Sequence, residues 1–108
     1  MSKRVSKWTA AHCAAVFLIS IALQQANAGD RTDQGRVTYA QNCSHCHGPN
    51  MVNSGTVTPD LRAFPDDKPR FIATVKQGKN GKMPPWGDLL NDEQIEDIWT
   101  YLSSRRNP

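Results

Sequence analysis

The residues with the clearest capacity for chemistry are two cysteines and a histidine, grouped as Cys43-Ser44-His45-Cys46-His47. This C-x-x-C-H pattern is the attachment signature of c-type haem. In a helical turn Cys43 and Cys46 lie on one face, where two thiols can add to the two vinyl groups along one edge of a porphyrin. His47 follows directly, and histidine is a common axial ligand of haem iron. The segment predicts one covalent haem c, attached through Cys43 and Cys46 and ligated by His47.

Three other uses of this motif are weaker. A thioredoxin-like C-x-x-C belongs near a βαβ pattern, and no such pattern is visible in the sequence. A structural zinc site needs four ligands, but beyond the motif the chain offers only His12 and Cys13, in a segment that we expect to be removed. A disulfide between Cys43 and Cys46 is chemically possible in an oxidising compartment, but it leaves His47 without a role.

Residues 1–28 have the three regions of a secretory signal peptide. These are the charges of Lys3, Arg4 and Lys7, an apolar run at 10–23, and the cleavage site Ala26-Asn27-Ala28. The alternative is an uncleaved membrane anchor, but the apolar run has only 14 residues, whereas a spanning helix needs about 20. We therefore expect cleavage after Ala28, a mature domain of residues 29–108 without a membrane span, and a periplasmic location.

The charge of the chain depends on this cleavage. The full sequence has a net charge of +3, and all of it comes from the three basic residues near the N-terminus. Residues 29–108 are formally neutral, so the charge gives no argument for a nucleic-acid partner, and we expect none. A mature chain of this size buries little apolar surface by itself. A covalently bound haem would supply the apolar centre that it lacks.

Hydrophobic periodicity predicts three helices and no strand in the mature chain. We expect them at about 33–46, 67–77 and 92–104. In the first helix Gly35 indicates close packing against another element, and the expected inward residues are Val37, Tyr39, Ala40 and Cys43. In the last helix Asn91 and Gln94 are spaced as a capping box. Its apolar stripe consists of Ile95, Ile98, Trp99 and Leu102.

The second axial ligand of the iron decides what a bound haem can do. His45 lies inside the attachment segment, and Met51 is only four residues past His47, too near to reach the opposite face of the ring easily. Met83 comes 36 residues after His47 in a proline-stiffened loop, which is long enough to wrap round. A methionine is more often a packing residue than a ligand. In a chain that already holds haem, we predict Met83 as the second metal ligand.

Charge is also uneven along the chain around Met83. Lys76, Lys79 and Lys82 precede it, whereas the residues that follow are acidic: Asp88, Asp92, Glu93, Glu96 and Asp97. This order predicts a dipolar protein that presents positive charge near the haem edge. The alternative is a set of surface charges that serve only solubility.

Taken in order, these motifs resemble a small bacterial class I cytochrome c over essentially the whole mature chain. The matching segments are Gly35-x-x-x-Tyr39-x-x-x-Cys43, Cys43-x-x-Cys46-His47-Gly48, Thr58-Pro59-Asp60-Leu61, Gly78 with Met83-Pro84, and Trp99-Thr100-Tyr101-Leu102. The resemblance implies an all-α class I cytochrome c fold, with three main helices packed around one haem. It also implies that the Pro59 carbonyl orients His47. Thr58 stands where the family often has glycine.

A narrower resemblance concerns the segments 50–62 and 82–86, which are similar to cytochromes associated with PQQ-dependent alcohol dehydrogenases. It implies a non-enzymatic carrier of single electrons from a quinoprotein dehydrogenase to a downstream cytochrome or oxidase. One alternative function is a haem enzyme or gas-binding protein, similar to a peroxidase, with a labile sixth ligand. The other is a haem-free thiol or metal protein.

Overall fold

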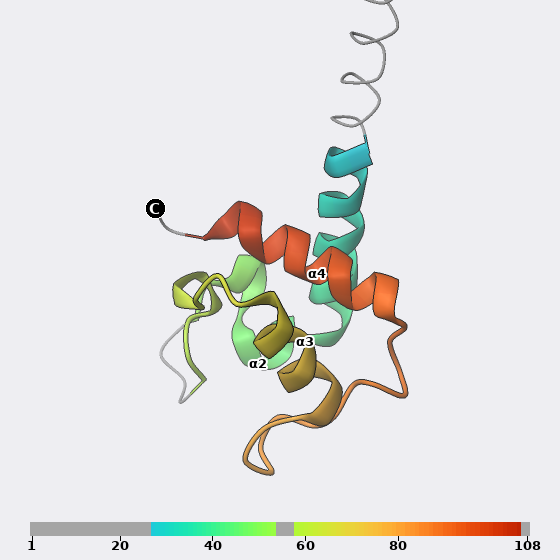
Figure 1. The fold of residues 1–108 in the computed structure, drawn as a ribbon. Coiled ribbons are helices and arrows are strands. Elements are labelled where there is room, and N and C mark those ends of the chain that lie inside the picture. The colour runs from blue at the N-terminus through green and yellow to red at the C-terminus, as the bar shows by residue number, and fades with distance from the viewer. Residues whose placement is uncertain (1–26, 54–57, 107–108) are drawn as a thin grey trace, which may run out of the picture.

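The computed structural model describes residues 27–53 and 58–106 (Figure 1). Within these two ranges the chain is helical and contains no strand. A first helix covers residues 27–42 and is followed by α2 (Ser44–His47), η1 (Pro49–Met51), η2 (Leu61–Ala63), α3 (Lys68–Gln77) and α4 (Asp92–Arg105). The predicted all-α class is therefore confirmed. The signal peptide predicted at residues 1–28 falls almost entirely outside the described residues.

The first helix starts earlier and ends earlier than the predicted range of 33–46. Residues 27–32 are already helical, and this end is supported by hydrogen bonds from Thr32 to Ala28 and from Gln34 to Asp30. The regular helix stops before Cys43, which has a φ of −116°. There the backbone N–H of Cys46 bonds to the Cys43 carbonyl three residues back. This tighter turn separates the helix from α2.

Only part of the predicted inward face of the first helix is correct. Tyr39 is buried, but Val37 is 44% exposed and Ala40 is also exposed, so these two predictions are wrong. The face that meets the rest of the protein instead repeats every four residues, through Arg31, Gly35, Tyr39 and Cys43. Residues at this spacing share one side of a helix.

The close packing expected at Gly35 is confirmed. A Cβ at this position would overlap the backbone carbonyl of Asp97 in α4, so only glycine lets the two helices cross at this distance. Figure 1 shows α4 running across the first helix. One turn further along, the rings of Tyr39 and Tyr101 pack with their centroids 5.7 Å apart.

The predicted boundaries of α3 and α4 agree closely with the structure. Asp67 caps α3 by accepting a hydrogen bond from the Arg70 backbone, and Asn91 and Gln94 form the predicted capping box of α4. The four stripe residues of α4 are all buried. Trp99 contacts Phe64 and Phe71 in an aromatic cluster, which joins α4 to α3 and to the loop before it.

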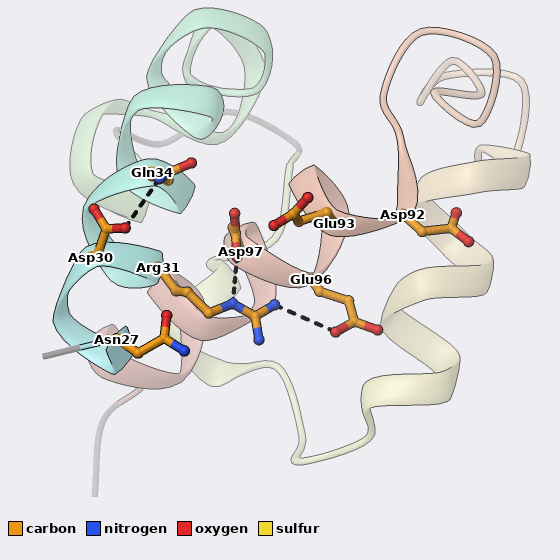
Figure 2. Close-up of a pocket in the computed structure, with 8 residues that line it drawn as sticks. All are labelled: Asn27, Asp30, Arg31, Gln34, Asp92, Glu93, Glu96 and Asp97. Carbon is orange, nitrogen blue, oxygen red and sulfur yellow. Dashed lines mark hydrogen bonds and ion pairs between the residues drawn. The ribbon is translucent and has the colours of Figure 1, made fainter. Parts of the chain in front are cut away.

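A polar pocket of about 430 Å³ lies beside the helix crossing (Figure 2). Its lining residues are Asn27, Asp30, Arg31, Gln34, Asp92, Glu93, Glu96 and Asp97. Within it, Arg31 Nε donates to Asp97 Oδ1 at 2.7 Å, and Arg31 Nη2 lies 3.5 Å from Glu96 Oε2. None of the four residues predicted to hold haem lines this pocket, so it belongs to the helix crossing.

Among the described residues, no helix has the length and apolar character needed to cross a membrane.

Candidate haem site

Cys43 lies in the turn between the first helix and α2, and Cys46 lies within α2, three residues further on. Both are free thiols; Cys43 is half-buried and packs against the core, whereas Cys46 is exposed. Burial, with a smaller contribution from Cys46, raises the pKa of the Cys43 thiol to about 11. Cys43 is therefore in contact with the core, whereas Cys46 is open to solvent.

His47 ends α2 and is half-buried. Burial lowers the pKa of its imidazole, and the nearby backbone of Pro59 offsets part of that effect. Its buried Nδ1 nevertheless forms no hydrogen bond of regular geometry with any described residue. The neutral imidazole is the form that binds metals. The structure places the Pro59 backbone near His47, but the orienting role that the resemblance implies for its carbonyl stays a prediction.

The backbone reverses immediately after His47. Gly48, the C-cap of α2, has φ 82° and ψ 155°, a conformation open essentially to glycine alone. A Cβ at Gly48 would also overlap the Val52 carbonyl. Two further left-handed residues follow, Asn50 at φ 54° and Met51 at φ 65°. The side chain of Met51 is fully buried in the core.

The loop that carries Met83 also begins with a glycine of positive φ at the end of a helix. Gly78 caps α3 with φ 74° and ψ −177°, and a Cβ there would overlap the Met83 carbonyl. Backbone bonds join Lys79 and Met83 in both directions, with N–O distances of 3.0 and 3.1 Å. Further on, Trp86 donates to the Val75 carbonyl at 2.9 Å. The loop is therefore closed by the Lys79–Met83 pair and, after Met83, is fastened to the C-terminal end of α3.

The residues that surround these two loops fit a flat apolar cofactor. Six partly buried side chains pack against the core from outside: Cys43, Leu61, Phe64, Ile72, Met83 and Trp86. They include one predicted attachment site and one predicted ligand. The Met83 thioether, the His47 imidazole and the two thiols are the kinds of group that bind haem iron and a porphyrin edge.

The sequence analysis did not reveal what two important side chains, Tyr39 and Asp97, do in the fold. Tyr39 donates its hydroxyl proton to the Gly48 carbonyl at 2.6 Å, and Asp97 is a buried carboxylate. Their positions in the sequence suggest that they lie near the motif and the core, because Tyr39 is four residues before Cys43 and Asp97 directly precedes Ile98 of the apolar stripe. The pairing of Asp97 with Arg31, 66 residues away, follows only from the helix crossing.

One family model, described as "Cytochrome C oxidase, cbb3-type, subunit III", matches residues 30–102. The chain belongs to this family of class I cytochromes c. As a member it carries haem c, and its all-α structure agrees with the class I fold. No solved structure matches the chain significantly.

Similar proteins include both whole cytochromes and parts of larger proteins. Cytochrome c6 of Rippkaea orientalis is 33% identical over 81% of this chain and 81% of its own length. Quinohemoprotein alcohol dehydrogenase ADH IIB of Pseudomonas putida is 37% identical over 72% of this chain. The cbb3-type oxidase subunit CcoP of Azospirillum brasilense is 28% identical over 82% of it. The cytochrome spans only 12% of the dehydrogenase and 32% of CcoP.

Proposed function

We propose that this cytochrome is a periplasmic carrier of single electrons, with haem attached through Cys43 and Cys46 and ligated by His47 and Met83. When bound, haem c supplies an iron that gains and loses one electron. The chain would hold the ring through Cys43 and Cys46, and His47 and Met83 would bind its iron. The observation that carries the proposal is the pair of ligand loops, each of which leaves a helix through a glycine in the same restricted conformation.

The same arrangement disfavours an enzymatic role. If His47 and Met83 occupy both axial positions, no position at the iron is left for a substrate. Methionine–histidine ligation also raises the reduction potential, as suits an electron carrier. The backbone bonds on both sides of Met83 argue against a labile sixth ligand, since they restrict the movement of the loop.

The similar proteins support a quinoprotein dehydrogenase as electron donor and a cytochrome or oxidase as acceptor. One relative is a quinohemoprotein alcohol dehydrogenase, and another is a subunit of a cbb3-type oxidase. This cytochrome would then correspond to the domain that such proteins carry within a longer chain. We propose that it exchanges electrons with partners of these two kinds.

Docking would use the positive charges near Met83. Lys79 and Lys82 are exposed and take part in no ion pair among the described residues, whereas Lys76 is bound to Asp92 at 2.6 Å and its charge is offset. The proposed docking charge is therefore limited to two lysines. Since steering by surface charge weakens with salt, Lys79→Glu with Lys82→Glu should slow electron transfer to an acidic partner mainly at low ionic strength. The control is Arg105→Glu, an exposed change at the far end of α4.

The proposal is tested first by a pyridine haemochrome spectrum and a redox titration of the purified protein. We expect one covalent haem and a reversible one-electron transition. Cys43→Ala and Cys46→Ala should each leave one thioether and reduce the yield of holoprotein. Normal yield of doubly attached haem in both variants would contradict the proposed attachment sites. Rapid binding of carbon monoxide by the reduced parent protein would contradict the proposal that His47 and Met83 both bind the iron.

A further inference from the structure

Tyr39 is placed to act on the segment that follows His47. Its ring is only 2% exposed, and its hydroxyl donates to the Gly48 carbonyl at 2.6 Å. The backbone of Met51 lies near the same hydroxyl. One side chain of the first helix therefore binds the first residue of the four-residue turn at 48–51 and lies beside the last.

This turn has an unusual backbone. Gly48, Asn50 and Met51 all have positive φ values of 82°, 54° and 65°. For residues other than glycine, left-handed conformations are unfavourable and persist only where the surroundings enforce them. Here the surroundings are the Tyr39 hydroxyl and the core that encloses the Met51 side chain, which has no exposed surface.

We propose that Tyr39 is a positioning residue for His47, because its hydroxyl fixes the left-handed turn at 48–51 and thereby the backbone from which the imidazole projects. This inference rests on the proposed role of His47 as an iron ligand. The hydroxyl is the part that matters, since the ring alone could pack in the helix crossing without holding the turn. A phenylalanine at position 39 would keep that packing and release the turn.

Tyr101 provides a matched control. It is equally buried, at 4% exposure, and its ring packs directly against that of Tyr39. Within the described part of the chain, its hydroxyl forms no hydrogen bond with the turn at 48–51. Tyr101→Phe therefore perturbs the same packing without touching the backbone next to His47. A merely structural role for Tyr39 would make the two phenylalanine variants equivalent.

The experiment compares the haem-loaded parent protein, Tyr39→Phe and Tyr101→Phe at a temperature where circular dichroism shows all three folded. The readouts are the reduction potential and the hyperfine-shifted proton resonances of the axial histidine. Tyr39→Phe should shift both, whereas Tyr101→Phe should match the parent. Equal changes in the two variants, or none in Tyr39→Phe, would overturn the inference while leaving the proposed function intact. A parent protein without an axial-histidine signal would overturn both.

A rescue variant tests the role of the strained turn separately. Asn50→Gly lowers the cost of a left-handed residue, so in the Tyr39→Phe background it should return the histidine resonances toward those of the parent. Alone it should change them little. Failure to rescue would show that the hydroxyl does not act through the conformation of this turn, and it would also overturn the inference.

Discussion

The helix crossing and the two ligand loops are held in different ways. At the crossing, side chains fit against each other: Gly35 admits the backbone of α4, Tyr39 packs on Tyr101, and Arg31 pairs with Asp97. In the two loops, the chain is held by backbone hydrogen bonds and by the restricted conformations of Gly48 and Gly78. Side-chain packing therefore stabilises the helix crossing, whereas backbone geometry positions the predicted ligands in the loops.

Because the crossing and the loops are held in different ways, we expect them to respond differently to mutation. Changes at the crossing should lower the free energy of unfolding and leave the iron ligands in place in whatever protein remains folded. The exception is the Tyr39 hydroxyl, which belongs to the crossing but reaches the turn at 48–51. Changes in the loops should alter the ligands at a smaller cost in stability.

Gly35→Ala should have the largest effect on stability. The added methyl group overlaps the Asp97 carbonyl, which is backbone and cannot move without displacing α4. Overpacking of this kind costs about 1–3 kcal/mol or more. Chemical denaturation of the holoprotein measures the loss. Gly29→Ala is the control, because a Cβ there contacts nothing, and equal stability of the two variants would contradict the close crossing.

Gly78→Ala should act mainly on the proposed ligand Met83. Its φ of 74° and ψ of −177° suit only glycine, and the new Cβ would overlap the Met83 carbonyl. We expect a destabilisation of about 1–3 kcal/mol, together with partial loss of methionine ligation. Visible absorption of the oxidised protein reports the ligation. Gly81→Ala also has a positive φ but open surroundings, so its ligation should stay intact; equal loss in both would contradict the special role of Gly78.

Arg31→Gln should weaken the crossing without changing the iron. The variant leaves the Asp97 carboxylate, whose side chain is 5% exposed, without its charged partner. We expect a loss of about 1–2 kcal/mol, since Arg31 itself is partly exposed. Arg36→Gln removes a surface pair with Asp33 and should cost almost nothing. A thermal unfolding series that ranks the two variants equally would contradict the importance of the buried pair.

The smallest expected effect is the loss of stability when Glu96 becomes protonated at acid pH. Lys68, and to a smaller extent Arg31, lowers the pKa of this carboxyl below its ordinary value of 4.5. Glu96 therefore stabilises the folded state above about pH 4.5, and this contribution is lost as the pH falls through the lowered pKa. The difference in melting temperature between the parent and Glu96→Gln should be present at neutral pH and disappear in acid. A difference that is independent of pH would contradict this ion pair.

The sequence predicted the helices best where local signals are strong. The capping box of α4 and its buried stripe depend on neighbours in the chain, and both are present. The inward face of the first helix was only partly predicted, because Val37 and Ala40 suggested a side that α4 does not cover. The Arg31–Asp97 pair and the Tyr39–Gly48 bond join distant parts of the backbone, so local patterns could not reveal them.

The most direct test of the account compares two methionines in the oxidised protein. The parent should show the methionine-to-iron absorption near the red end of the visible spectrum. Met83→Ala should keep its covalent haem, lose this band, lower the reduction potential and admit exogenous ligands. Met51→Ala removes a fully buried side chain and should cost about 2–5 kcal/mol of stability, yet keep the band. Loss of the band in Met51→Ala with its retention in Met83→Ala would contradict the proposed ligation of the iron by His47 and Met83.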